Sequence, residues 1–384
     1  MSMPLRMFAF ALACLPAAVV ANGPAVPSEA EVERHARQAM TATGARGLAI
    51  AIIDRGKVRS VQSFGERNDR GDPLTPDTIM YGASLTKAVF GYWTAIQVDK
   101  GIVVLDNPIA GMLSRPLPEY GNLRAYGNWG DLAGDERWRA LTPRHLLNHS
   151  SGFANFAFLE PDGKLKFHFQ PGARYAYSGE GIMLLQFALE TGMGLNVGAE
   201  IDRQLFDPLG LKNANLIWQP RFAGNLADGW TADGSVEAHD ERSRVRAAGS
   251  MDISVADMAT LSAAMVRGWG LSRAMRREFA RGTLPITTRS QFPTLQGEAP
   301  VTDRPKAAAA LGVVAFTGPQ GPGYFKGGHN DSTANTMVCL ERGQRCVVVM
   351  SNDVRAERKF PQLVESLLGP TGAPWRWEYP DADY

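Results

Sequence analysis

The chain has 384 residues, with 40 Lys and Arg against 39 Asp and Glu, so its formal net charge at neutral pH is +1. Hydrophobic residues make up 45% of the chain and charged residues 21%, close to the averages of globular proteins. These values exclude low-complexity disorder and a coiled coil, and the balance of charge argues against binding to nucleic acid. A chain of this length forms one large domain or two moderate ones.

The first residues have the pattern of a secretory signal peptide. Arg6 is the only charged residue before Glu29, and residues 7–20 are uncharged, mostly apolar and followed by a short side chain suited to cleavage. The run is short for a membrane span. We therefore expect residues 1–21 to be removed and the mature protein to be secreted, to the periplasm, with no membrane span. An uncleaved anchor and a lipoprotein modified at Cys14 are the alternatives.

The mature chain opens with a helix and a hairpin. Ser28 and Glu31 form a capping box, and the apolar stripe that follows ends before Gly44. Residues 47–53 predict an apolar strand, and residues 57–64 predict the strand that returns beside it after a tight turn.

The middle of the chain predicts helices rather than strands. Residues 85–104 read as a helix, and residues 112–140 read as a loop-rich insert because Pro, Gly and Trp occur there without a period. From its aromatic content, with Trp129 and Trp138, we expect this insert to form one wall of the substrate cleft. Further helices are predicted at 141–149, 180–191, 200–206 and 255–266.

The C-terminal part predicts strands again. They cover residues 311–316, 336–340 and 346–350, and residues 356–368 read as a final helix. Strands at both ends and helices between them predict an α+β fold in which one antiparallel sheet is built from both termini and flanked by helices. We expect a sheet domain of residues 22–95 and 245–384 and an inserted helical domain of residues 96–244.

Two cysteines remain after removal of the signal peptide. Cys339 and Cys346 flank a predicted hairpin turn, which would place their sulfurs roughly opposite each other on paired strands. In an oxidising compartment we predict a disulfide there. Two buried free thiols are the alternative, because a hydrogen-bonded strand pair is a poorer site for a bridge.

The main chemical signal is a serine with a lysine three positions later. On a helix, Ser84 and Lys87 share a face, so the lysine amine can reach the serine hydroxyl. Serine is a weak nucleophile until a base takes its proton, and a lysine with a lowered pKa can be that base. The alternative is a helix-capping serine followed by a surface lysine, but the apolar residues on both sides of the pair argue against it.

Two further segments carry candidate residues. Tyr177 lies in a glycine-bounded loop just before a predicted helix, where a phenol can relay a proton to a leaving group, although a packing role is the ordinary one for such a tyrosine. Lys326 precedes Gly327 and Gly328, and glycines there let a substrate approach a strand edge closely. An ordinary glycine-rich turn is the alternative.

Together these motifs resemble a known superfamily. Ser84-x-x-Lys87, Tyr177-Ser178-Gly179 and Lys326-Gly327-Gly328 occur in the order and spacing of the serine β-lactamases and penicillin-binding proteins. The chain is most similar to the branch that contains class C β-lactamases, D-alanyl-D-alanine carboxypeptidases and carboxylesterases. The resemblance covers nearly all of the mature chain, with supporting stretches at 141–152, 207–211 and 247–250.

The resemblance implies a β-lactamase-like fold and a role for each candidate residue. Ser84 would be the acylated nucleophile, Lys87 and Tyr177 would share the acid and base work, and Lys326 would supply the positive field. The backbone N–H groups of Ser84 and His329 would form the oxyanion hole. Gly328 would border the substrate.

Two positions depart from the superfamily's pattern. Gly179 stands where the second motif ends in Asn, and Gly327 stands where the third motif has Ser or Thr. The resemblance implies that the missing Asn contacts the lysine and the substrate amide, and that the missing hydroxyl binds a substrate carboxylate. Both changes favour a carboxylesterase or an unusual amidase over an efficient β-lactamase. Glu180 is a candidate substitute for the Asn.

Other classes of function fit less well. His145 and His149 have zinc-ligand spacing on a helix, but Leu146 replaces the glutamate of a zinc protease. An α/β-hydrolase would need a second glycine after Ser84. A non-catalytic penicillin-binding or sensor domain would be expected to lack one of the three candidate catalytic side chains.

The sequence therefore predicts a serine hydrolase that cleaves an ester or amide through an acyl-enzyme on Ser84, most similar to a carboxylesterase. Carboxypeptidase action on D-alanyl-D-alanine or weak β-lactamase action is the alternative. We expect no cofactor, no metal and no nucleic acid, and a small molecule or peptide as the substrate. The oligomeric state is left open.

Overall fold

A large antiparallel sheet forms the centre of the fold. The computed structural model describes residues 25–384, so the predicted signal peptide of residues 1–21 lies outside the described residues. The sheet has eight strands in the order β10-β11-β12-β13-β14-β15-β1-β2. These are β1 (Gly47–Asp54), β2 (Lys57–Gly65), β10 (Leu284–Pro285), β11 (Ala307–Ala309), β12 (Val314–Gly318), β13 (Gly321–His329), β14 (Ala334–Leu340) and β15 (Arg345–Ser351).

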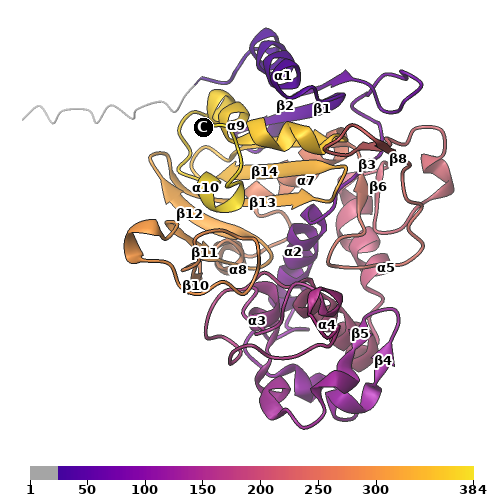
Figure 1. The fold of residues 1–384 in the computed structure, drawn as a ribbon, viewed down its shortest axis with the longest axis vertical. Coiled ribbons are helices and arrows are strands. Elements are labelled where there is room, and N and C mark those ends of the chain that lie inside the picture. Colours follow the sequence, from indigo (N-terminus) through magenta and orange to yellow (C-terminus); the bar gives the residue numbers. More distant parts are fainter. Residues whose placement is uncertain (1–24) are drawn as a thin grey trace, which may run out of the picture.

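Both ends of the described chain contribute to this sheet, as the sequence predicts. β1 pairs with β2 on one side and with β15 on the other, always antiparallel. Figure 1 shows the indigo N-terminal elements next to the yellow and orange C-terminal ones. The α+β, β-lactamase-like fold with a sheet built from both termini is thus confirmed.

Helices cover both faces of the sheet. The main ones are α1 (Glu29–Thr43), α2 (Leu85–Asp99), α3 (Pro143–Leu147), α4 (Gly179–Phe187), α5 (Val197–Ile201), α6 (Asp207–Leu209), α7 (Val255–Arg267), α8 (Arg273–Phe279), α9 (Phe360–Leu368) and α10 (Trp375–Glu378). Every residue of β1 is buried. Its side chains alternate between the two faces of the sheet: one set packs toward α1 and α9 (Leu48, Ile50 and Ile52), and the other packs toward α7 (Ala49, Ala51 and Ile53). A strand covered on both faces has a continuous apolar run, which is the pattern of residues 47–53.

Helix α2 connects the sheet with the helical part of the molecule. Every residue from Leu85 to Gln97 is buried, so the helix is enclosed on all sides. Figure 1 shows it between the sheet and the region that contains α3 and α4. Residue Ser84, directly before this helix, is therefore placed where the two parts meet. The assignment of residues 96–244 to an inserted domain stays a prediction.

Three short sheets complete the fold. β3 (Met80–Tyr81) and β6 (Ala214–Asn215) flank β9 (Asp252–Ile253), and two hairpins are formed by β4 (Asn122–Leu123) with β5 (Gly127–Asn128) and by β7 (Gly229–Trp230) with β8 (Val236–Glu237). No single helix in residues 25–384 has both the length and the apolar character needed to cross a membrane. The two segments 179–192 and 197–209 reach that standard only as a pair, bent by 96°.

Several sequence predictions agree with the structure. The capping box of Ser28 and Glu31 begins α1, and Gly44 ends it in a left-handed conformation. The hairpin of β1 and β2 and the strands β14 and β15 lie at the predicted places. Cys339 and Cys346 are opposite each other on β14 and β15 and are joined by a disulfide, as predicted.

Other boundaries differ from the predictions. The strand predicted at 311–316 begins only at Val314, because Gly312 turns with a φ of 78° against the backbone of Lys87. The helix predicted at 85–104 ends at Asp99. Residues 354–359 form a 3-10 turn before α9, and α9 is followed by the short helix α10, so it is not the final helix.

Candidate active site

Ser84 lies at a tight turn from strand to helix. Ala83, directly before it, has a φ of 45°, which is a strained conformation for a residue other than glycine. The Thr86 hydroxyl donates to the Ala83 carbonyl at 2.6 Å and accepts from the Met251 N–H at 3.1 Å, so the turn is fixed from both sides. The turn places Ser84 at the N-terminus of the buried helix α2, where its side chain lines a cavity.

Lys87 lies one turn further along α2 and points at Ser84. Its Nζ donates to the Ser84 Oγ at 3.0 Å and to the Ala248 carbonyl. Burial, together with the positive charges of Lys326 and Arg246, holds the pKa of Lys87 well below its ordinary value. The neutral amine is therefore favoured, and a neutral amine in contact with a serine hydroxyl can accept its proton.

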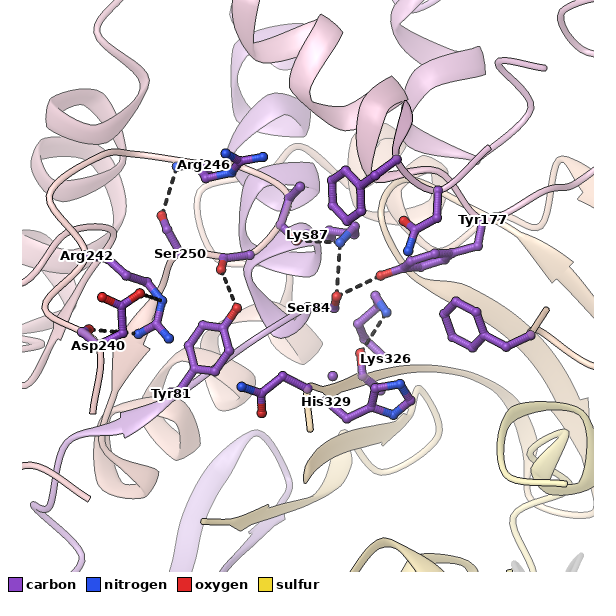
Figure 2. A pocket seen from close by; sticks show the side chains of 18 of the residues that line it. Tyr81, Ser84, Lys87, Tyr177, Asp240, Arg242, Arg246, Ser250, Lys326 and His329 are labelled. Atoms are coloured by element: carbon purple, nitrogen blue, oxygen red, sulfur yellow. Dashed lines mark hydrogen bonds and ion pairs between the residues drawn. The ribbon is translucent and has the colours of Figure 1, made fainter. Parts of the chain in front are cut away.

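Tyr177 approaches Ser84 from another element. Its hydroxyl donates to the Ser84 Oγ at 2.8 Å, and Figure 2 shows Lys87 and Tyr177 pointing at Ser84 from different sides. Burial raises the pKa of Tyr177 above its ordinary value, so the phenol keeps its proton. A protonated phenol beside the nucleophile is suited to donate a proton to a leaving group.

The position of Tyr177 depends on the residues around it. The Ser178 side chain caps α4 by accepting from the Gly181 N–H at 3.0 Å. The ring of His149 lies 4.5 Å from the Tyr177 ring, and its Nδ1 accepts from the Ser178 N–H at 3.2 Å. Burial and the nearby lysines hold the pKa of His149 well below its ordinary value, so this histidine is a neutral packing group.

The predicted zinc-ligand spacing of His145 and His149 does not produce a common face. Helix α3 ends at Leu147, and His149 has a φ of 57°, so the two side chains are not on one helix. The His145 ring instead contacts the Ala140 carbonyl at 3.2 Å.

The edge of strand β13 forms the opposite side of the site. Lys326 is buried, its Nζ donates to the Gly327 carbonyl at 2.7 Å, and it lies 5.0 Å from the centroid of the Tyr177 ring. Burial lowers the pKa of Lys326 to about 8, although the negative charge of Glu378 acts to raise it. Lys326 therefore keeps a positive charge at neutral pH, next to the three groups already described.

Gly328 brings the strand against the start of α2. A Cβ at Gly328 would lie 2.8 Å from the backbone nitrogen of Ser84 and 2.9 Å from that of Leu85, so only glycine allows this approach. The next residue, His329, directs its ring away, where Nδ1 lies 2.8 Å from the Glu357 carboxylate. The backbone of β13 thus passes beside the Ser84 amide, as an oxyanion hole made by both would require.

These groups open into one cavity of about 700 Å³. All eight predicted site residues except Gly179 line it: Ser84, Lys87, Tyr177, Lys326, Gly327, Gly328 and His329. Three phenylalanines add an apolar surface: Phe156, Phe158 and Phe292. Arg242, Arg244 and Arg246 line another part of the cavity.

The space beside Gly179 is occupied by an aromatic ring. A Cβ at Gly179 would collide with the ring of Phe156. The neighbouring Asn155 accepts from the Gly179 N–H with its Oδ1 at 2.9 Å and lines the cavity. A side chain longer than hydrogen at position 179 would need Phe156 to move.

The space beside Gly327 is occupied by a carboxyl group. A Cβ at Gly327 would collide with Oε1 of Glu378 and would lie 3.0 Å from the Tyr379 hydroxyl. Glu378 is the last residue of α10 and also lines the cavity. The third motif therefore lacks a hydroxyl, and a distant part of the chain supplies an acidic group in its place.

Two sequence hypotheses about the site are wrong. Glu180 does not replace the missing Asn, because its Oε1 accepts from the Ala157 N–H at 2.9 Å and the residue does not line the cavity. Residues 112–140 form no wall of the cavity. Trp129 and Trp138 are buried in the core of the helical region, so their aromatic character serves packing.

Sequence reasoning missed Asn155, Phe156 and Glu378. None of them belongs to a motif, and each reaches the site through a fold that sequence patterns do not specify in detail. The only available signal was indirect. Two glycines stand where larger side chains are usual, which indicates that other groups fill the space.

Comparison with known proteins places this site in context. The family described as Beta-lactamase matches residues 32–365. The chain is 27% identical over 198 residues to the D-alanyl-D-alanine-carboxypeptidase/endopeptidase AmpH of Escherichia coli, covering 49% of this chain and 50% of the relative. It is 27% identical over 205 residues to a D-aminopeptidase of Gluconobacter oxydans, covering 50% of this chain and 36% of the relative. The chain thus spans at most about half the length of these curated relatives.

A solved structure agrees with the fold. The D-alanine carboxypeptidase AmpC from Burkholderia cenocepacia superposes with a TM-score of 0.68 at 16% identity, over 88% of this chain and 98% of the other. At that level of identity the likeness concerns the fold alone.

Proposed function

Because the chain belongs to the beta-lactamase family and is a serine hydrolase, we propose that it cleaves small esters or amides through an acyl-enzyme on Ser84, with a carboxylesterase-like preference. The observation that carries this proposal is the pair of contacts on one hydroxyl. Lys87 Nζ lies 3.0 Å and Tyr177 OH 2.8 Å from the Ser84 Oγ, in a cavity that a small substrate can enter.

The shifted pKa values support a division of roles. Lys87, whose pKa is lowered, accepts the Ser84 proton as Oγ attacks the carbonyl carbon. Tyr177, whose pKa is raised, donates its proton to the leaving oxygen or nitrogen, and the proton on Lys87 then restores the phenol. Water attacks the acyl-enzyme by the same route in reverse and releases the acid.

The developing negative charge needs donors at the carbonyl oxygen. We assign this role to the backbone N–H groups of Ser84 and His329, and the close approach of Gly328 to the Ser84 amide supports it. Lys326 contributes positive charge from the same strand, near Tyr177. Neither role needs the His329 ring, which bonds Glu357.

The walls of the cavity support a preference for apolar esters. Phe156 and Phe158 stack with ring centroids 5.2 Å apart, and Phe292 lies 5.4 Å from the Tyr177 ring. Such a surface suits the apolar part of a substrate. The hydroxyl that would read a carboxylate in the third motif is absent at Gly327.

A second candidate function is peptidase action on D-alanyl peptides, with weak action on β-lactams. The names of the relatives AmpH and D-aminopeptidase favour it. Arg244 and Arg246 also line the cavity and offer positive charge to a substrate carboxylate. Under this alternative, the two arginines bind the substrate carboxylate in place of the missing hydroxyl.

We further propose that the protein is exported. The signal-like pattern of residues 1–21 and the disulfide between Cys339 and Cys346 support an oxidising compartment such as the periplasm.

Steady-state kinetics with p-nitrophenyl butyrate test the proposed function. We expect turnover by the wild-type protein and a loss on the order of 10⁴-fold or more in Ser84→Ala. The turn at Ala83 is fixed by backbone and Thr86 contacts, so this variant is expected to fold normally. Ester turnover that Ser84→Ala retains would refute the assignment of the nucleophile. Turnover of D-alanyl peptides but not of the ester would favour the second candidate.

A further inference from the structure

Glu378 reaches the cavity from a segment outside the family match. The match ends at residue 365, and the chain then continues through residues 369–374 into α10. Two indole groups hold this helix in place. Trp375 Nε1 donates to Glu365 at 2.7 Å, and Trp377 Nε1 donates to the Thr288 hydroxyl at 3.0 Å. The position of Glu378 is therefore fixed by the fold.

The Glu378 carboxyl is buried but not satisfied. The residue is only 8% exposed, and among residues 25–384 its Oε2 makes no hydrogen bond of good geometry, with the Gln291 side chain as its polar neighbour. The hydroxyl of Tyr379, 5% exposed, has the Thr336 side chain as its polar neighbour, makes no hydrogen bond of good geometry among these residues, and lies beside the same glycine, Gly327. Buried polar groups normally have partners, and an unpaired carboxylate is costly to bury. A site that retains two such groups indicates a partner supplied by a ligand.

Lys326 is the obvious internal partner, but its contacts lie elsewhere. Its Nζ donates to the Gly327 carbonyl, and the ion pairs found within 4 Å in the described part of the chain do not include Lys326 with Glu378. Burial raises the pKa of the Glu378 carboxyl to about 7, although Lys326 and His329 favour its charged form. The carboxyl thus remains available on the cavity side of β13.

We propose that Glu378 and the Tyr379 hydroxyl form a subsite that binds a positively charged or hydrogen-bond-donating nitrogen of the substrate, such as a primary ammonium group, and that disfavours a carboxylate. The subsite occupies the place that a side chain at position 327 would fill, beside strand β13, and Glu378 lines the cavity that contains Ser84. This inference rests on the proposed function, because it names the substrate class of that same site.

The charge of this subsite has a direct consequence for substrate choice. A hydroxyl at position 327 would donate to a carboxylate, whereas a carboxylate at the same place repels one and accepts from an amine. Substrates with an amino group are therefore expected to be held better than matched neutral compounds. Matched carboxylates are expected to be held least well.

Three arylboronic acids test the proposal. The boron atom forms a reversible tetrahedral adduct with a nucleophilic serine oxygen, so binding reports on the site without turnover. The compounds are 3-(aminomethyl)phenylboronic acid, 3-methylphenylboronic acid and 3-carboxyphenylboronic acid. Inhibition constants are measured against p-nitrophenyl butyrate at about pH 7.5, where a carboxyl with a pKa of about 7 is mostly ionised and Lys326, with a pKa of about 8, is mostly protonated.

In the wild-type protein we expect the aminomethyl compound to bind best and the carboxy compound worst. In Glu378→Gln, which keeps the shape and removes the charge, the ratio of their inhibition constants is expected to fall by about tenfold. Tyr379→Phe removes only the hydroxyl and is expected to weaken binding of the aminomethyl compound relative to binding of the methyl compound. Because each result is a ratio within one variant, a general loss of activity does not produce it.

Glu357→Gln is the matched control. It removes the same charge from the carboxylate that bonds the His329 ring, outside the cavity that contains Ser84. The inference is supported if the ratio changes in Glu378→Gln and stays within about twofold in Glu357→Gln. An unchanged ratio in Glu378→Gln, or an equal change in both variants, would overturn it.

The proposed function fails in a different way. If no boronic acid inhibits ester turnover, or if inhibition does not require Ser84, the nucleophile is wrong and the subsite with it. If all three compounds inhibit equally in every variant, the nucleophile stands and only the subsite is refuted.

Discussion

The Ser84 side of the cavity and the wall around Gly179 and Gly327 are built in different ways. Lys87 lies three positions after Ser84 at the start of one helix, and Tyr177, 93 residues further along the chain, reaches Ser84 from the loop before α4. The wall instead has two glycines whose neighbouring space is filled from elsewhere, by Phe156 and by Glu378. In this protein the proposed reacting groups lie in short sequence motifs, whereas the groups that fill the space beside the two glycines come from outside those motifs.

This difference has a physical origin. Proton transfer at a serine hydroxyl needs partners within hydrogen-bond distance, and a helix turn provides such a spacing locally. Filling the volume beside a glycine needs only a group of suitable size and charge, from any element that packs there. The groups that fill the space beside the glycines can therefore change while the spacing of the proposed reacting groups is kept.

Replacement of the buried lysine is expected to have the largest effect on the Ser84 side. In Lys87→Met the base is lost, and we expect kcat/KM for p-nitrophenyl butyrate to fall by about 10³-fold. Lys100→Met, at the end of the same helix, is the matched control and is expected to retain activity. A Lys87→Met protein with near wild-type activity would place the base elsewhere.

The same variant is expected to become more stable at low pH. The pKa of Lys87 is lowered in the folded state, so the unfolded chain binds more protons between the two pKa values and the wild-type protein gains stability as pH rises there. Replacing the amine by a methionine side chain removes the free-energy cost of burying a protonated lysine. Thermal unfolding of Lys87→Met should show a gain of about 1 kcal/mol or more at mildly acidic pH that shrinks as the pH approaches the ordinary lysine pKa. A gain that grows with pH would contradict the account.

Restoring an asparagine tests the wall around Gly179. The Asn side chain in Gly179→Asn would collide with the Phe156 ring, so we expect a loss of about 1–3 kcal/mol in the free energy of unfolding. The double variant Phe156→Ala with Gly179→Asn should recover part of that loss, with a coupling of about 1 kcal/mol. Denaturant unfolding of the wild type, both single variants and the double variant measures the coupling. Simple additivity would mean that Phe156 does not fill this space.

The disulfide is expected to matter least for activity. Cys339 and Cys346 lie in the buried pair of β14 and β15 and do not line the cavity. Replacing both by alanine should lower the free energy of unfolding by on the order of 2 kcal/mol and leave kcat/KM unchanged within about twofold. A large change in kcat/KM would show that the far strands also determine the reacting geometry.

The sheet and the candidate reacting groups could be predicted from the sequence because both have local signals. A few residues are enough to recognise the apolar run of residues 47–53, and the same holds for the spacing of Ser84 and Lys87. Of the long strand β13 only the end around Lys326 to His329 was expected to be strand, because its glycines lack the β-branched character of ordinary strands. Its pairing with β12 and β14 supplies the stability that composition does not indicate.

The remaining parts depend on tertiary contacts. The tryptophans of residues 112–140 could equally have lined a cleft or a core, and only packing against residues such as Phe187 decides the matter. Glu378 follows a segment rich in Pro and Gly, and nothing in its neighbours indicates a return to β13. Long-range placement of this kind is set by the whole core and not by local propensity.

Acylation of Ser84 by an ester is tested by time-resolved intact-mass spectrometry of the purified protein with p-nitrophenyl butyrate and, in parallel, with benzylpenicillin. We expect a transient butyryl adduct that is absent in Ser84→Ala, and no lasting penicillin adduct, because the wall at Gly327 presents a carboxylate to the antibiotic's own carboxylate. A lasting penicillin adduct on Ser84, with no adduct from the ester, would contradict this expectation.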